Sequence, residues 1–134
     1  MDLEKNISLA TAAMQYTHDK LSLGASNKLE DAFLSFGRSL LCVVAMRSVD
    51  ISTPAVGKVP GWLVEVAAKA EATRCGNCGE QAAIAYLHLH SVLNASPIDY
   101  MARTNADHAF VVLGRMSGSN LSATSTWGSN AIIC

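Results

Sequence analysis

The stretch "ATRCGNCGEQAAIAYLHLHSVL", Ala72 to Leu93, decides the fold because it joins a glycine-rich turn to a long helical run. Cys75 and Cys78 lie on either side of Gly76 and Asn77, and Cys78 borders the uninterrupted part of the run. A helix is predicted from about residue 78 to 94, with an inner face made by Ala82, Ala85, Tyr86, Leu89 and Val92. Such a cysteine pair can be a metal clip, a redox dithiol, two structural cysteines, or a nucleophile beside a bystander.

The composition predicts one folded domain. Of the 134 residues, 50% are apolar and 16% are charged, which excludes intrinsic disorder. The net charge is −1 and the 10 basic residues form no stripe, so no nucleic-acid partner is expected. No apolar run reaches the roughly 18 residues of a membrane span, and the acidic start lacks the pattern of a secretory signal. The 4 unevenly spaced cysteines do not suggest a disulfide scaffold, so we expect a cytoplasmic protein folded under reducing conditions.

The order of the predicted elements favours an α+β fold with a small antiparallel sheet. A first helix is expected over 3–21, with its apolar stripe at Leu3, Ile7, Ala10, Met14, Thr17 and Leu21. Further helices are expected over 28–47 and 62–73, separated by the loop "DISTPAVGKVPG". After these come "IDYMA", "HAFVVLGR" and "AIIC", which are predicted as strands, the second of them buried.

The surroundings of the cysteine pair favour a nucleophile. Zinc would need three or four ligands, and the only nearby candidates, His88 and His90, point in different directions on a helix. A redox dithiol usually follows a strand, whereas here a helix precedes the pair. A thiol in the first turn of a helix lies at the positive end of the helix dipole, which lowers its pKa. This position belongs to Cys78, and Cys75 is interpreted as structural or as a bystander.

Small and polar neighbours suit an acyl-transfer site at Cys78. Gly76 and Gly79 allow a substrate to approach the backbone closely. The backbone N–H of Cys78 and the side chain of Asn77 are candidate donors to an oxyanion.

His108 is the candidate general base. It starts the strand "HAFVVLGR", and the end of a strand can meet the start of a helix that packs on it. His88 and His90 lie about 15 Å or more from Cys78 along the same helix, too far for proton transfer. His18 falls on the polar side of the first helix and is expected to be solvated.

The motifs "GNCGEQAA", opening a helix, and "DHAFVVLGR", forming a later strand, resemble the transglutaminase-like (papain-like) cysteine enzymes, in particular the Cys–His–Asp domains of bacterial effectors and toxins. The resemblance covers roughly 73–134 and implies that Cys78 is the nucleophile and His108 the general base. It divides a single domain, 1–134, into a helical N-terminal part, 1–61, and a transglutaminase-like core, 62–134. No cofactor or metal is implied.

The family resemblance also implies an activity and partners. The enzyme would be a cysteine protease, a glutamine deamidase or a transglutaminase, and therefore a hydrolase or acyltransferase with a protein substrate. In the effector setting it would be made in the cytoplasm, secreted or injected into a target cell, and held by an inhibitory or immunity protein in the producer. A catalytically incomplete binding module of the same fold, or a small zinc-binding interaction domain, are the alternatives.

The acid that would orient His108 is the point of departure from the family pattern. The family commonly carries it near an Asp-Pro-Trp-like sequence, whereas "WGSNAIIC" stops where it would be expected. Asp107 should point away from His108 on an extended strand, and Glu80 more plausibly stabilises the helix dipole. Asp99 is the least implausible substitute. We therefore expect a chain truncated at its C-terminus, with weak or no activity.

Overall fold

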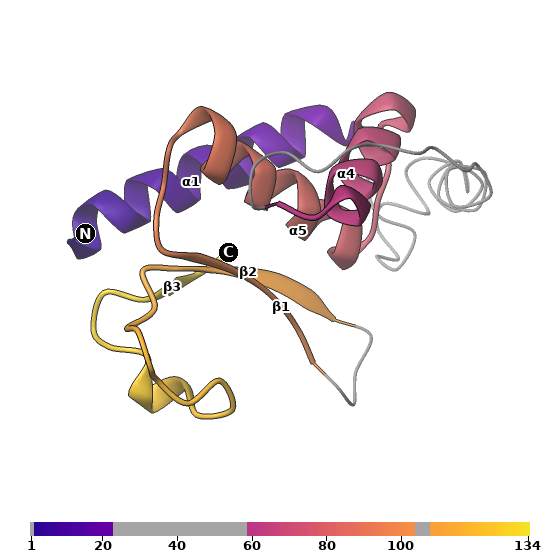
Figure 1. Cartoon of the computed structure of the whole chain (residues 1–134). Helices are drawn as coiled ribbons and strands as arrows, with labels where there is room; N and C mark the ends of the chain where they lie inside the picture. The colour runs from indigo at the N-terminus through magenta and orange to yellow at the C-terminus, as the bar shows by residue number, and fades with distance from the viewer. Residues whose placement is uncertain (1, 23–58, 104–107) are drawn as a thin grey trace, which may run out of the picture.

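The computed structural model describes residues 2–22, 59–103 and 108–134. In these ranges three α-helices lie on one face of a three-stranded antiparallel sheet (Figure 1). The α+β class with a small antiparallel sheet is therefore confirmed. The helix predicted over 28–47 and most of the loop after it lie outside the described residues. No helix within the described ranges is long and apolar enough to cross a membrane.

Helix α5, Cys78–Leu87, is the centre of the fold. It contacts α1, Leu3–Lys20, on one side and α4, Gly61–Thr73, on the other, and it packs on β1 and β2 below (Figure 1). Its buried apolar positions are Ala82, Ala83, Ile84 and Ala85. Because most of these side chains are single methyl groups, the neighbouring helices and strands can approach the α5 backbone closely.

The α5 helix does not continue to Asn94 as one regular helix. It turns into a π-helix, η1, His88–Val92, in which the N–H of Leu93 donates to the carbonyl of His88 at 3.0 Å. The wider π turn changes which side chains face inward. Leu89 is fully buried as expected, but Val92 is 67% exposed, so its predicted place on the inner face is wrong.

Helix α1 forms as predicted, but its buried face is different. The inward positions are Asn6, Ala10, Ala13 and Thr17, whereas Ile7 and Met14 are exposed. Asn6 is buried because its Nδ2 donates to the carbonyl of Asn130 at 2.7 Å. The buried apolar side chains of α1 are alanines, as in α5, and their small size lets the two helices pack closely.

The sheet follows the order β1-β2-β3, with β1 at Ile98–Ala102, β2 at Ala109–Leu113 and β3 at Ile132–Ile133. All three predicted strands are present, and Val111, Val112 and Leu113 of β2 are fully buried. The segment between β2 and β3 lies on the face of the sheet away from the helices and contains one short 3₁₀ turn, Thr124–Thr126 (Figure 1). The β1–β2 register pairs Ala102 with Ala109, close to the start of α5.

Candidate active site

The start of α5 is fixed by its capping residues. Asn77 is the N-cap, and its backbone N–H donates to Oε2 of Glu80 at 3.0 Å as part of a capping box. Glu80 is only 5% exposed although it carries a carboxylate. A negative group is favoured at this end of a helix dipole, and the capping bond offsets part of the cost of burial. The prediction that Glu80 stabilises the helix start agrees with this arrangement.

Gly76 is required by the close approach of the turn to Glu80. A Cβ added at Gly76 would lie 2.5 Å from Cβ of Glu80, a separation that real side chains do not show. Nε2 of Gln81 also donates to the Gly76 carbonyl at 3.0 Å, which ties the turn back onto the helix. The turn that leads into Cys78 is therefore fixed by its close packing against Glu80 and by the hydrogen bond from Gln81.

The two cysteines of the motif have different chemical states. Cys75 is fully buried and disulfide-bonded. Cys78 is half-buried and takes no part in a disulfide. The interpretation of Cys75 as structural agrees with its burial, and the two sulfurs are not bonded to each other. Among the described residues no group of three or more His, Cys, Asp or Glu side chains could hold a metal ion.

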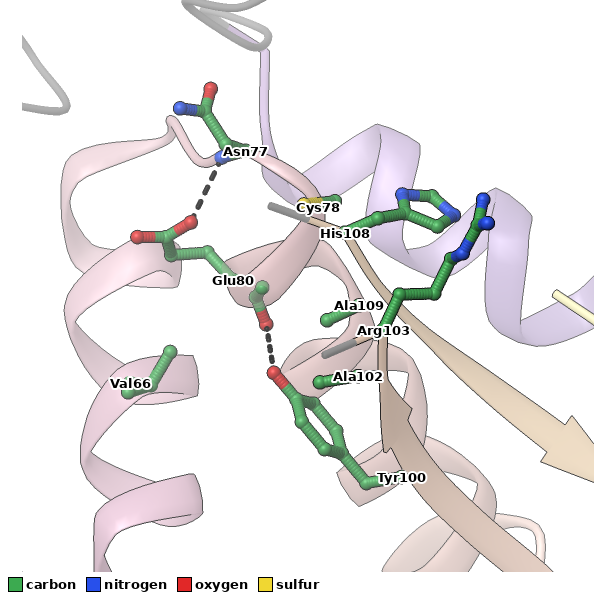
Figure 2. Close-up of a pocket in the computed structure, with 10 residues that line it drawn as sticks. Val66, Asn77, Cys78, Glu80, Tyr100, Ala102, Arg103, His108 and Ala109 are labelled. Carbon is green, nitrogen blue, oxygen red and sulfur yellow. Dashed lines mark hydrogen bonds between the residues drawn. The ribbon is translucent and has the colours of Figure 1, made fainter. Parts of the chain in front are cut away.

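A pocket of about 410 Å³ lies between the start of α5 and the end of the β1–β2 hairpin at which β1 stops and β2 begins. Its lining includes all the predicted site residues, namely Asn77, Cys78, Gly79 and His108. Figure 2 shows Cys78 entering from α5 and His108 from the start of β2. Ala102 and Ala109, which face each other across the hairpin, leave room between these two elements.

The position of His108 follows from the hairpin register. Its carbonyl accepts the N–H of Arg103 at 3.0 Å, immediately beyond the last pair of the β1–β2 ladder. The imidazole is exposed and its ring centroid lies 5.6 Å from that of Phe110. The other histidines lie elsewhere, since His88 stacks on Tyr16 at 3.9 Å and His90 faces Tyr86 at 6.3 Å.

Tyr100 is a pocket residue that the sequence did not reveal. Its hydroxyl donates to the Gly79 carbonyl at 3.3 Å, so it connects β1 to the first turn of α5 (Figure 2). Burial, and then the negative charges of Cys78 and Glu80, raise the pKa of this phenol. The proton therefore stays on the oxygen, which keeps it a donor. A tyrosine at an alternate strand position gives no sign of this role, because such residues usually serve packing.

Arg103 is the second pocket residue that was missed. It follows β1, it is exposed, and its guanidinium lies beside the His108 ring (Figure 2). In the sequence it is one of several scattered basic residues, and only the hairpin register brings it opposite His108.

Two predicted accessory roles find less support. The Asn77 side chain belongs to the capping box, and Figure 2 shows its amide directed away from Cys78, so it is a poor oxyanion donor. Asp99 forms a two-point ion pair with Arg115, with Nε to Oδ2 at 2.9 Å and an Nη2 to Oδ1 distance of 3.3 Å. It also pairs with Val112 in the sheet, well away from the hairpin end that carries His108. Asp99 is therefore not the acid that orients His108.

No protein-family model, curated protein sequence or solved structure matches this chain. Function is therefore inferred from the pocket itself.

Proposed function

We propose that this protein is a cysteine-dependent acyl-transfer enzyme with a transglutaminase-like core, acting on a protein substrate. The observation that carries the proposal is that Cys78 and His108 line one open pocket although they come from separate elements. A thiol in the first turn of a helix and an imidazole at the start of an antiparallel strand are the groups that nucleophilic catalysis by cysteine requires.

The reaction would proceed through a thioester. The Cys78 thiolate attacks a substrate carbonyl carbon, and the positive end of the α5 dipole favours the negative charges that develop there. The tetrahedral intermediate expels an amine, which takes a proton from the His108 imidazolium, and a thioester remains on Cys78. Water or a second amine then attacks the thioester while His108 accepts its proton, and the thiol leaves. Hydrolysis, deamidation and cross-linking share these steps and differ in the amine that leaves and in whether water or a second amine attacks the thioester.

Tyr100 has a positioning role in this scheme. Its bond to the Gly79 carbonyl connects the strand that precedes the hairpin loop to the helix turn that carries Cys78. The distance between nucleophile and base depends on how closely β1 and β2 pack on α5, and Tyr100 is a direct polar contact across that boundary.

A binding module of the same fold is the second candidate. The observation that favours it is that the imidazole of His108 makes no hydrogen bond within the described part of the chain. A catalytic imidazole normally has a partner on its second nitrogen that fixes its tautomer.

Alkylation by iodoacetamide near pH 7 separates the two candidates. In an enzyme, Cys78 is labelled fast, and His108→Ala slows that labelling by about tenfold or more. Cys134 is the internal reference, because burial raises the pKa of its thiol and it should react slowly. The labelled cysteine is identified by peptide mass mapping. If Cys78 and Cys134 react at the same slow rate, the enzyme proposal is wrong and the binding module is supported.

A further inference from the structure

The pocket holds a cation that the acyl-transfer scheme does not use. Arg103 lines the same pocket as Cys78 and His108, and in the described ranges its guanidinium donates no hydrogen bond and makes no ion pair. The contrast with Arg115 is direct, since that guanidinium is held by Asp99 at 2.9 Å and by Oγ of Ser119 at 2.8 Å. Arg115 therefore has a structural partner, whereas Arg103 has none among the residues that the structure describes.

A backbone hydrogen bond places Arg103 next to His108, the proposed general base. The Arg103 N–H donates to the His108 carbonyl at 3.0 Å, so the two residues face each other across the hairpin. Figure 2 shows the guanidinium alongside the imidazole, on the side of the pocket away from Val66 and Tyr100. A substrate whose carbonyl lies between Cys78 and His108 would therefore present its neighbouring atoms to Arg103.

Among the described lining residues of the pocket, the other charged side chain is Glu80. Its carboxylate is 5% exposed and accepts the Asn77 N–H at 3.0 Å, so it is turned into the helix start. Arg103 is exposed and can reach a bound molecule. Of the two charged side chains among the described lining residues, the accessible one is therefore the positive one.

We propose that Arg103 selects the substrate: it binds a carboxylate next to the carbonyl that Cys78 attacks, so the preferred substrate is an acidic peptide segment. A guanidinium can hold a carboxylate through two parallel hydrogen bonds, which fixes orientation as well as charge. This inference rests on the proposed function for its reacting groups, and it names the substrate class of the same site.

Two alkylating reagents that differ in charge test this without a known substrate. Iodoacetate carries a carboxylate and iodoacetamide a neutral amide, and in both cases the Cys78 thiolate displaces iodide to form a thioether. The ratio of the iodoacetate rate to the iodoacetamide rate at Cys78 is compared with the same ratio for the unfolded protein. We expect the folded protein to favour iodoacetate, and Arg103→Gln to lower the ratio by about tenfold; because both rates depend on the same thiolate, the ratio cancels any change in its amount.

Charge-matched variants show whether the effect is local. Lys5→Gln removes one positive charge from the exposed start of α1 and should leave the ratio unchanged. Arg103→Lys keeps the charge but loses the planar two-point contact, so an intermediate ratio is expected. Added salt should reduce the iodoacetate rate alone. An unchanged ratio in Arg103→Gln, or an equal fall in Lys5→Gln, would overturn the inference.

Peptide competition identifies the source of the carboxylate. N-acetyl-Gln-Glu amide should protect Cys78 from iodoacetamide better than N-acetyl-Gln-Lys amide, and this difference should vanish in Arg103→Gln. Equal protection by the two peptides would contradict selection for acidic peptides, as would protection by succinate equal to that by the acidic peptide. Slow iodoacetamide labelling of Cys78 in every variant would instead count against the proposed function, so the two failures can be told apart.

Discussion

The two ends of the central helical segment carry similar residue types in opposite settings. At its start, Cys78 and Glu80 border an open pocket that also contains His108. At its other end, His88 is stacked on Tyr16 at 3.9 Å, and the Tyr16 hydroxyl donates to Glu71 at 2.9 Å. Titratable side chains therefore occur at both ends, and the pocket described above lies at the first. The difference shows that accessibility, and not residue type, distinguishes a site from a packed polar cluster.

Removing the thiol should give the largest effect of any change at either end. With p-nitrophenyl acetate as acyl donor, we expect Cys78→Ala to abolish the burst of p-nitrophenolate and to lower turnover on the order of 10³-fold or more. The release of p-nitrophenolate is followed by absorbance. His88→Gln is the matched change at the far end and should leave the burst unchanged. A burst that survives in Cys78→Ala but disappears in His88→Gln would reverse the comparison.

The glycine ahead of the helix start should be the most sensitive position for stability. Gly76→Ala forces a Cβ against Cβ of Glu80, so we expect a loss of about 1–3 kcal/mol in the free energy of unfolding. Gly79→Ala is the control, because its Cβ would meet only the Tyr100 hydroxyl at an ordinary 3.7 Å. That change should be neutral or stabilising by less than about 1 kcal/mol. Urea denaturation measures both, and equal losses would show that the turn is not tightly fixed.

His88, at the far end of the central helical segment, should make the free energy of unfolding depend on pH. Burial lowers the pKa of His88 below its ordinary 6.5, and the Glu71 charge acts in the opposite direction without cancelling it. The unfolded chain therefore binds a proton at higher pH than the folded chain does. This contribution to stability is fully present above about pH 6.5 and is lost as the pH falls from there toward the lower folded pKa.

His88→Phe tests that assignment because phenylalanine keeps a ring against Tyr16 and cannot titrate. The variant should lose less stability than the wild type between pH 7.5 and pH 5.5, as measured by urea denaturation at each pH. Lys20, whose Nζ lies 5.3 Å from the Tyr16 ring centroid, is present in both proteins and does not distinguish them. Identical losses in the two proteins would exclude His88 as the source.

The smallest predicted effect concerns the residues that flank the segment. Arg74, before the start, and Asn94, after the far end, both have left-handed backbones, with φ of 65° and 54°. Asparagine tolerates this conformation and arginine does not, so Arg74→Gly should stabilise the protein by about 0.5–1 kcal/mol. Asn94→Gly should change stability much less. A thermal denaturation scan of both variants suffices, and a larger gain for Asn94→Gly would show that the assumed strain at Arg74 is absent.

The sequence predicts where helices and strands form better than it predicts which side of a helix is buried. The helices that end at Lys20 and Thr73 and all three strands follow from apolar spacing and turn residues. The buried face of α1 does not follow from apolar spacing. Asn6 is buried, where its side chain donates a hydrogen bond to the Asn130 carbonyl, whereas Ile7 is exposed. Apolar spacing alone favours the larger side chain. The π turn that exposes Val92 does not follow from apolar spacing either.

The candidate site was predictable only in part for a similar reason. Cys78 and His108 stand at the ends of elements, which marks them in the sequence. Tyr100 and Arg103 enter the pocket only because β1 pairs with β2 in one register and packs on α5. Asp99 was proposed for a role near His108, but its two-point contact with Arg115 depends on a partner sixteen residues away. Such pairings depend on three-dimensional contacts that no local pattern encodes.

The buried alanines of α5 have a consequence for entropy. Ala82, Ala83 and Ala85 have no side-chain torsions to freeze, so burying them costs no rotamer entropy when the protein folds. Three of the four buried apolar side chains of α5 therefore have no rotamers that could rearrange against the neighbouring elements. We expect the Cys78 backbone to move together with the helices and strands packed on α5.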